Sequence, residues 1–366
     1  VEITEAIAAN GWTAIVASAG GKLVPAVERA GGHHVTLPLA TRSPIGMLRN
    51  AGRLTALIRH AGVDLVHARS RAPAWSAWLA THRTGVHFVT TYHGAYGEDL
   101  PFKRQYNAIM ARGERVIAAS RFVADLVAAR HGVEADRIRI IPRGVDTAVF
   151  DPAAVGSERT RALETIWAVP PHVPVILLPG RLTGWKGQSV LLDAIALLPR
   201  RDVICVMAGA DQGRTGYRLS LSRQTERLGI ADRVRLSGNC DDMPAALALA
   251  EVVVHASTKP EAFGRVVIEA QAMARPVIAS DLGGPVETVE HGVTGWRVPP
   301  RDPSALAGAI EYVLAMPAAG RVAIGAQARA SVMARCTTGA MQAATMEVYR
   351  EVLADTRPAS CKQSRR

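Results

Sequence analysis

The sequence predicts an α/β protein with two parallel sheets, and three observations lead to that fold class. The chain has 366 residues, 48% hydrophobic and 20% charged, which is enough for two ordinary globular domains. Short apolar runs alternate with amphipathic stretches along most of its length, as in repeated strand-helix-strand units. A less regular segment rich in Pro, Gly and Ala, residues 147–173, interrupts the alternation. We therefore expect one parallel sheet on each side of it.

The apolar runs predict the individual strands. Those of the first half are WTAIVAS, HVTLPL, DLVHA, HFVTTY, RVIAAS and RIRIIP, and those of the second half are VILLPG, VICVMAG, VRLSG, VVVHAS and PVIAS. The stretch 303–356 reads as helices rich in Ala and Met. We expect an N-terminal domain at 1–160, a C-terminal domain at 161–340, a helix at 341–356 that packs back on the first domain, and a disordered tail at 357–366.

Composition argues against several classes of protein. No apolar run approaches the roughly 18 residues of a membrane span, and the first residues lack the order of a signal peptide. The four cysteines show no C-x-x-C spacing, which argues against a zinc site and against a disulfide framework. We expect a cytoplasmic protein.

The positive charge is concentrated in the first half of the chain. The net charge is +11, and residues 1–150 contain 18 Lys or Arg against 11 Asp or Glu. Such an excess favours anionic partners, namely membrane headgroups, nucleic acid or phosphorylated substrates. Simple solubility explains the charge equally well.

Polar or glycine residues follow four of the predicted strands, at the edge where parallel sheets bind ligands. They are His93-Gly94 after HFVTTY, Arg181 to Lys186 after VILLPG, the loop to Glu261 after VVVHAS, and Asp281 to Gly284 after PVIAS.

Arg181 and Lys186 precede a helix that we expect to begin near Gly187. Two cations at a helix N-terminus suit a diphosphate. The spacing is not that of a P-loop, so ATP hydrolysis is not supported. The alternative is a solvated loop, since Lys and Arg are mostly surface residues.

Two glutamates, Glu261 and Glu269, lie eight positions apart in PEAFGRVVIE. Glu261 is expected in a turn and Glu269 on an apolar helix, where a carboxylate needs a partner such as Arg265. Eight helical residues rise roughly 12 Å, more than the ~5–9.5 Å between paired glycosidase carboxylates. Two separate binding roles fit better, with the amides of residues 262–266 facing a phosphate or a sugar between them.

Together these motifs resemble the retaining glycosyltransferases of family 4, which have the GT-B fold of two Rossmann-like domains facing across a cleft. The resemblance runs through TTYHG, SRFVADLV, IPRGVDTAVFDP, GRLTGWKG, GNCDDMP, PEAFGRVVIEA, ARPVIASDLGGPVETV and HGVTGWRVPPRD. Its most specific part is the E-x7-E pair with the upstream R-x4-K. It implies transfer of a sugar, with retention of configuration, from a UDP-sugar or GDP-sugar to a hydroxyl of a glycan or lipid-linked acceptor.

The resemblance also implies roles for individual residues. Arg181 and Lys186 would hold the diphosphate and Glu269 the ribose. Glu261 would position the transferred sugar without acting as a nucleophile, and His93 would approach that sugar from the N-terminal domain. GNCDDMP would lie near the nucleobase. The residues expected to bind the donor are Arg181, Lys186, Ala262, Phe263, Gly264, Arg265, Val266 and Glu269, and those expected to act in catalysis are Glu261, His93, Arg181 and Lys186.

No D-x-D motif is present, so we expect neither a metal nor another cofactor. Cationic side chains and helix dipoles would stabilise the leaving nucleoside diphosphate instead. The reaction implied by the resemblance is an internal return, in which the leaving phosphate helps to deprotonate the acceptor hydroxyl.

The chain departs from the family pattern in a few places. Ala262 stands where Gly is frequent, and Arg143 stands where Asn is frequent. The first residues, VEITEAIAANGW, resemble a helix that a strand and a Gly-rich loop usually precede, so we expect the N-terminal domain to lack its first strand.

The sequence leaves two rival functions open. One is another GT-B activity, a sugar-nucleotide epimerase or a phosphorylase. The other is nucleic-acid binding, suggested by the pI near 10.1. No helix-turn-helix or RNA-recognition signature supports the latter, and aromatic residues make up only 5% of the chain, so we expect no nucleic-acid partner.

An arginine-rich stretch, residues 42–71, bears on the acceptor. Arg69 and Arg71 follow a strand and are expected to contact phosphate. Arg49 and Arg53 share one face of a helix, which is either ordinary solvated surface or a surface that binds an anionic partner. Resemblance to bacterial enzymes of lipopolysaccharide or exopolysaccharide synthesis also suggests an anionic acceptor at the inner face of the cytoplasmic membrane. The arginines are Arg42, Arg49, Arg53, Arg59, Arg69 and Arg71, and the residues expected in the core are Leu48, Leu54, Leu57 and Ile58.

Overall fold

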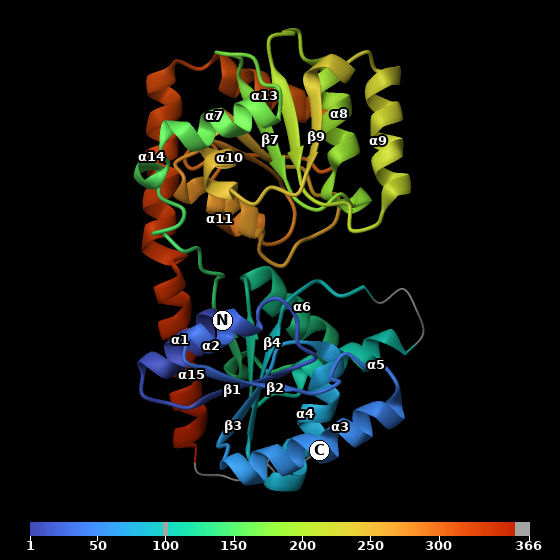
Figure 1. Cartoon of the computed structure of the whole chain (residues 1–366), viewed down its shortest axis with the longest axis vertical. Helices are drawn as coiled ribbons and strands as arrows, with labels where there is room; N and C mark the ends of the chain where they lie inside the picture. The colour runs from blue at the N-terminus through green and yellow to red at the C-terminus, as the bar shows by residue number, and fades with distance from the viewer. Residues whose placement is uncertain (98–101, 356–366) are drawn as a thin grey trace. The chain divides into compact units, whose positions relative to one another are not determined.

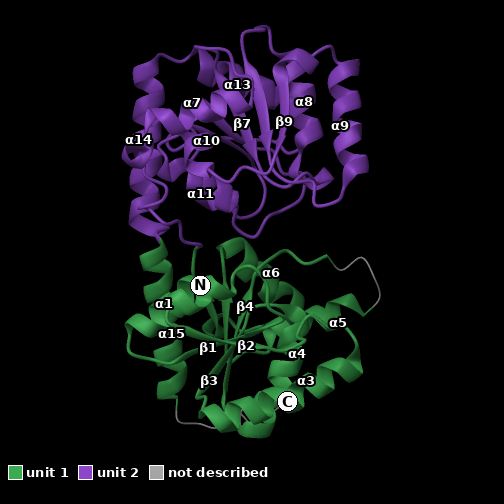
Figure 2. Ribbon diagram, viewed as in Figure 1, with its two compact units in different colours: residues 1–142, 338–366 green, residues 143–337 purple. Residues whose placement is uncertain are grey.

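The computed structural model describes residues 1–97 and 102–355, which form two compact units (Figures 1 and 2). Unit 1 contains residues 1–142 and the described chain from Thr338 onward, and unit 2 contains residues 143–337. The division after Pro142 differs from the expected boundary at 160, because the chain beyond it already pairs within unit 2. There the Val145 N–H donates to the Cys336 carbonyl at 2.9 Å. The predicted tail, 357–366, lies outside the described residues.

Unit 2 is built on a six-stranded parallel sheet with the order β12-β11-β10-β7-β8-β9. All five strands predicted in the second half of the chain are confirmed. The prediction missed β12, which has only three residues, one of them the half-buried Arg297. The strands are β7 (Val175–Pro179), β8 (Ile204–Ala208), β9 (Val234–Gly238), β10 (Val252–His255), β11 (Val277–Ser280) and β12 (Trp296–Val298).

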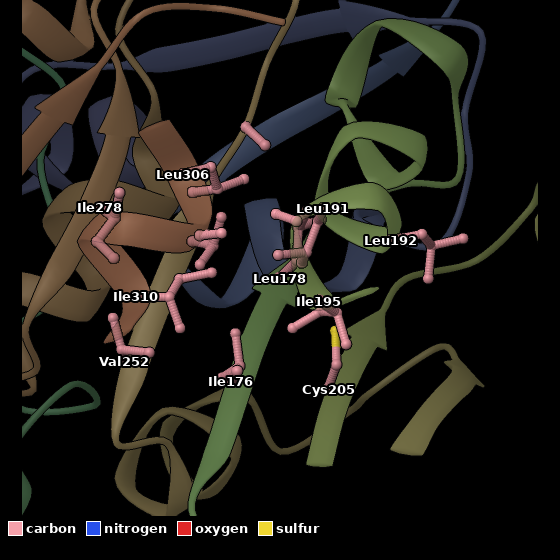
Figure 3. Close-up of a cluster of buried hydrophobic side chains, with 14 of the residues drawn as sticks. Ile176, Leu178, Leu191, Leu192, Ile195, Cys205, Val252, Ile278, Leu306 and Ile310 are labelled. Atoms are coloured by element: carbon pink, nitrogen blue, oxygen red, sulfur yellow. The ribbon is translucent and has the colours of Figure 1, made fainter. Parts of the chain in front are cut away.

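Helices cover both faces of this sheet, because successive strand side chains point to opposite sides (Figure 1). Ile176 and Leu178 of β7 pack with α8 and α13 (Figure 3), and Leu221 of α9 belongs to the same cluster. Val175 and Leu177 pack in a second cluster with α7, α10 and α11. The helices of unit 2 are α7 (Ser157–Ile166), α8 (Gln188–Leu197), α9 (Thr215–Arg227), α10 (Met243–Leu249), α11 (Arg265–Ala272), α12 (Pro285–Thr288), α13 (Pro303–Ala315) and α14 (Ala318–Arg335), with short 3₁₀ turns η3 (Pro152–Ala154), η4 (Gly184–Lys186) and η5 (Ala231–Arg233).

Helix α7 corrects the interpretation of residues 147–173 as irregular. Of its ten residues only Leu163 is buried. Its apolar side chains are few among polar ones, so the helix gives only a short periodic signal.

Unit 1 contains a parallel pair of strands and a four-stranded parallel sheet with the order β3-β4-β5-β6. All six strands predicted in the first half are confirmed. They are β1 (Ala14–Ser18), β2 (Gly32–Thr36), β3 (Leu65–Ala68), β4 (His87–Tyr92), β5 (Arg115–Ala118) and β6 (Ile138–Ile140). The helices are α1 (Glu2–Ala9), α2 (Val24–Arg29), α3 (Pro44–Ala61), α4 (Arg71–Thr84), α5 (Lys103–Asn107), α6 (Arg121–His131) and α15 (Thr338–Ala354), with 3₁₀ turns η1 (Ala108–Ala111) and η2 (Ala135–Arg137).

The last helix, α15, packs on unit 1 although the chain reaches it from unit 2. Its Tyr349 hydroxyl lies 2.6 Å from His67 Nδ1, and Glu351 accepts from Arg115 Nε at 2.7 Å. Its apolar side, with Met346 and Val352, is buried with Val89 and Ile117 of the sheet.

The buried face of α3 differs from the predicted one. Leu54 and Ile58 are buried as expected, but Leu48 is 54% exposed, and Met47 and Ala51 take its place in the core. The prediction failed because it considered only large apolar residues, whereas the buried side of α3 also includes small and polar ones. Leu48 and its neighbour Ile45, which is 65% exposed, therefore lie on the surface.

Within the described ranges, no single helix is long and apolar enough to cross a membrane. The pair α13 and α14, bent by 111°, passes the same test of length and composition when taken together. The apolar side chains of α13, Leu306, Ile310 and Val313, lie in the protein core, which accounts for its composition.

Candidate functional site

The candidate site lies where the strand order of unit 2 reverses, between the adjacent central strands β7 and β10. In open parallel sheets the loops that follow two such strands diverge and leave a crevice for a ligand. The loop after β7 contains Arg181 and Lys186, and the loop after β10 contains Glu261. The two motifs singled out from the sequence therefore meet at the ligand-binding edge of this sheet.

Backbone contacts hold the two loops together. The Thr258 N–H donates to the Trp185 carbonyl at 2.7 Å. Gly187 has a φ of +76°, and a Cβ there would lie 1.8 Å from the Ala256 carbonyl oxygen. Only glycine permits this approach, which explains the Gly directly after Lys186.

Lys186 and Glu261 form an ion pair, with Nζ 2.7 Å from Oε1. Their side chains are 12% and 14% exposed, so solvent screens the pair only weakly. The Lys186 ammonium also lies 4.8 Å from the centre of the Trp185 ring.

Two further donors contact the same oxygen of Glu261. His255 Nε2 lies 2.7 Å from Oε1, and the Ser257 hydroxyl donates to it as well. Among the residues that the structure describes, none donates a hydrogen bond to Oε2. Glu261 therefore has one fully occupied oxygen and one that remains available to a ligand.

The surroundings of Glu261 favour its charged form. Burial by itself would raise the pKa of this carboxyl. The hydrogen bond and the electrostatic attraction of His255, together with the ammonium of Lys186, outweigh burial and hold the pKa well below its usual range. Glu261 is thus an anion that can accept hydrogen bonds from hydroxyl groups.

Glu269 lies on α11, as predicted, and is paired with Arg265. Arg265 Nε is 3.5 Å from Glu269 Oε1, and the two side chains are 53% and 15% exposed. The helix begins at Arg265, directly after Gly264 at φ +81°. The amides of residues 262–266 therefore surround its N-terminal end.

A glycine pair supports the loop that carries Glu261. The Gly284 N–H donates to the Glu261 carbonyl at 2.9 Å. A Cβ on Gly284 would lie 2.5 Å from Phe263 Cα, and a Cβ on Gly283 would lie 2.6 Å from the Glu261 carbonyl oxygen. Both glycines after β11 are required by close backbone packing.

Arg181 is exposed, and its Nη1 lies 3.5 Å from Gln212 Oε1. Its carbonyl accepts from Gln188 Nε2 at 3.0 Å, which fixes the backbone below it. Most of the guanidinium donors are thus left to solvent or to a ligand.

Three predicted residues belong to unit 1, where His93 follows β4, and Arg69 and Arg71 follow β3. His93 Nε2 accepts from Arg69 Nε at 3.5 Å. The guanidinium of Arg71 lies 4.2 Å from the centre of the Tyr96 ring and donates to Asn107 Oδ1 at 2.8 Å. These contacts favour a packing role for Arg71 and leave Arg69 as the better candidate for a phosphate contact.

Sequence reasoning missed His255 and Ser257. His255 ends the run Val252-Val253-Val254, and a histidine in an otherwise β-branched buried strand is a signal that could have found it. As for metal ligands, no group of three or more suitably placed His, Cys, Asp or Glu side chains occurs within the described part of the chain.

Comparison with known proteins identifies the family. Residues 161–331 match the family model described as glycosyl transferases group 1, and residues 1–149 match glycosyltransferase family 4. The crystal structure of a glycosyltransferase from Rickettsia africae is 34% identical, with a TM-score of 0.90 over 97% of this chain and 94% of that chain. The present chain belongs to glycosyltransferase family 4. Its predicted GT-B fold class is confirmed.

Two other similar proteins are informative. The D-inositol 3-phosphate glycosyltransferase of Jonesia denitrificans is 31% identical over 277 residues, which are 69% of this chain and 63% of that protein. This chain thus spans less than two thirds of that relative. The structure of Anabaena HepE in complex with UDP-glucose is 25% identical, with a TM-score of 0.83 over 95% of this chain and 94% of that one.

Proposed function

We propose that this family 4 enzyme transfers a sugar from a nucleoside-diphosphate sugar to a hydroxyl of a glycan or lipid-linked acceptor, with retention of configuration and without a metal. The observation that carries the proposal is the contact between Lys186 and Glu261 at the strand ends. It brings a cation for the departing diphosphate next to an anion for the hydroxyls of the sugar.

The proposed donor contacts follow from the arrangement around that pair. Arg181 and Lys186 neutralise the diphosphate, and the amides of residues 262–266 add donors at a helix N-terminus. Glu269 accepts from the ribose hydroxyls and Glu261 from the transferred sugar. The UDP-glucose complex of Anabaena HepE supports a UDP-sugar as the donor, with a GDP-sugar as the alternative.

In the proposed reaction the residues act by preorganised electrostatics. Negative charge grows on the diphosphate as the glycosidic bond breaks, and Arg181 and Lys186 already face that charge. The departing phosphate takes the proton of the acceptor hydroxyl, which then attacks from the same side. Glu261 holds the sugar, and His93 contributes a hydrogen bond.

Turnover of UDP- and GDP-sugars with and without acceptors tests this proposal, with product stereochemistry read by NMR. We expect a new glycosidic bond of retained configuration, and equal rates with and without EDTA. Isomerisation of the donor without acceptor would indicate an epimerase, and dependence on inorganic phosphate a phosphorylase. A strict Mn²⁺ or Mg²⁺ requirement would contradict the role assigned to the two cations.

We propose further that the acceptor is anionic and lipid-linked, as in lipopolysaccharide or exopolysaccharide synthesis. The name of the Jonesia relative includes D-inositol 3-phosphate, a phosphorylated compound, which agrees with a phosphate contact by Arg69. On α3 the exposed Ile45 and Leu48 lie near the exposed Arg49 and Arg53 along the helix. This α3 surface, defined by those four residues, suits an anionic lipid headgroup layer, with apolar side chains to insert and cations for phosphate. The enzyme would then work at the inner face of the cytoplasmic membrane.

A further inference from the structure

His255 is a buried polar residue at the end of an apolar strand. It is the last residue of β10, which lies between β7 and β11 in the sheet, and it is 4% exposed. The three residues before it are buried valines. A polar side chain in such a place is costly unless its hydrogen bonds are satisfied.

The two ring nitrogens of His255 have different surroundings. Nε2 lies 2.7 Å from Glu261 Oε1 and 3.3 Å from Ser257 Oγ. Nδ1 is buried and has no hydrogen-bond partner in the described parts of the chain. A carboxylate only accepts hydrogen bonds, so Nε2 is the nitrogen that bears hydrogen.

The charged groups that face His255 are the carboxylate of Glu261 and, bound to the same oxygen, the ammonium of Lys186. The Ser257 hydroxyl donates to that oxygen too. Of these donors to Oε1, His255 is the one that belongs to a buried strand.

We infer that His255 is a positioning residue, which fixes Oε1 of Glu261 and thereby leaves Oε2 to accept from a hydroxyl of the donor sugar. The inference rests on the proposed function. In that function Lys186 also binds the diphosphate. Its ion pair with Glu261 weakens as negative charge develops on the diphosphate, so Lys186 alone cannot hold the carboxylate in place. His255, attached to a buried strand, is an anchor that the diphosphate does not attract.

Three substitutions at one position test this role. His255→Gln keeps an N–H near the place of Nε2, His255→Asn has the same amide but is too short to reach Glu261, and His255→Leu has no donor. Because a misplaced reacting group costs about 100-fold, we expect Leu and Asn to lower kcat by about 10-fold to 100-fold. We expect the KM for the donor and the affinity for UDP to change less than about threefold, and Gln to recover most of the lost kcat.

A matched control separates this role from the loss of a buried histidine. His87 Nδ1 lies 3.1 Å from Glu114 Oε2 in unit 1, at the amino end of β4, away from the strand ends that bind ligands. His87→Leu also removes the contact between a histidine and a carboxylate. We expect this variant to have a lower Tm and an unchanged kcat.

Several outcomes would overturn the inference. Wild-type kcat in His255→Leu would do so, and so would a loss of kcat that Gln does not restore. Should the Leu variant fail to fold, ¹⁵N NMR of the wild-type enzyme decides: hydrogen on Nε2 supports the inference, and hydrogen on Nδ1 alone refutes it. If the wild type transfers no sugar at all, the proposed function itself fails, which is a distinguishable result.

Discussion

The ammonium of Lys186 and the carboxylate of Glu261 lie 2.7 Å apart, from loops that follow the two central strands of unit 2. Because both side chains are largely buried, removal of either leaves the other with an unbalanced charge. Arg181 is the simpler residue for testing a cation of the donor site. It is exposed, and within the described chain it forms no ion pair.

We expect Arg181→Ala to reduce turnover by about 10²-fold to 10³-fold, because it removes a positive charge that faces the departing diphosphate. Tm should remain that of the wild type, since the side chain is exposed. Arg223→Ala, an exposed arginine on α9, is the matched control and should leave turnover unchanged. Activity of Arg181→Ala within a factor of about three of the wild type would contradict the assignment.

The charge of Glu261 leads to a prediction about stability and pH. Its pKa in the folded protein lies below the ordinary value of 4.5, so its ionisation stabilises the fold above that pH. This contribution is lost as the pH falls below 4.5 toward the folded-state pKa. The Tm difference between the wild type and Glu261→Gln should therefore be constant from about pH 8 to pH 5 and shrink on further acidification. A difference that persists unchanged at pH 3 would show that Glu261 is not held in its charged form, and Glu158→Gln, exposed on α7, should show no such trend.

Most of the strands could be predicted because their residues are apolar and β-branched, as in β7 and β10. The missed elements lack that signal: β12 is too short, and α7 buries one side chain. The face of α3 was misjudged at Leu48 because Asn50, Ala51 and Thr55 share its buried side. When the buried side of a helix includes small and polar residues, its large apolar residues alone do not predict which face is buried.

The sequence could predict those residues of the candidate site that lie in loops directly after strands. The switch point brings together Lys186 and Glu261, which lie far apart in the sequence. What sequence could not supply were contacts that depend on the fold: His255 reaching Glu261 from within a strand, and Arg71 covered by Tyr96.

Glu269 forms an ion pair with Arg265. A role of Glu269 in nucleotide binding and a structural role therefore have to be tested with separate variants. If Glu269 binds ribose, Glu269→Gln should weaken UDP or GDP binding by about 10-fold to 100-fold in calorimetry, the cost of a lost charged hydrogen bond. Arg265→Gln removes the same ion pair while leaving the carboxylate, and it should weaken binding far less because Arg265 is 53% exposed. Unchanged nucleotide affinity together with a lowered Tm in Glu269→Gln would indicate a structural glutamate.

The α3 surface leads to the last prediction, on membrane binding. We expect the enzyme to co-sediment with anionic liposomes but not with neutral ones, and to be released as salt increases. Arg49→Gln with Arg53→Gln should weaken binding to anionic liposomes about 30-fold, because each basic residue near such a surface contributes on the order of 1 kcal/mol. Ile45→Ser with Leu48→Ser should weaken it as well, but with the salt dependence retained, since these side chains contribute insertion and not charge. Leu197→Ser, which alters a leucine 55% exposed in unit 2, is the control and should bind as the wild type does. Binding that is absent, or equal for neutral and anionic vesicles, would make an acceptor free in solution the better hypothesis and leave the exposed arginines of α3 as solvated surface.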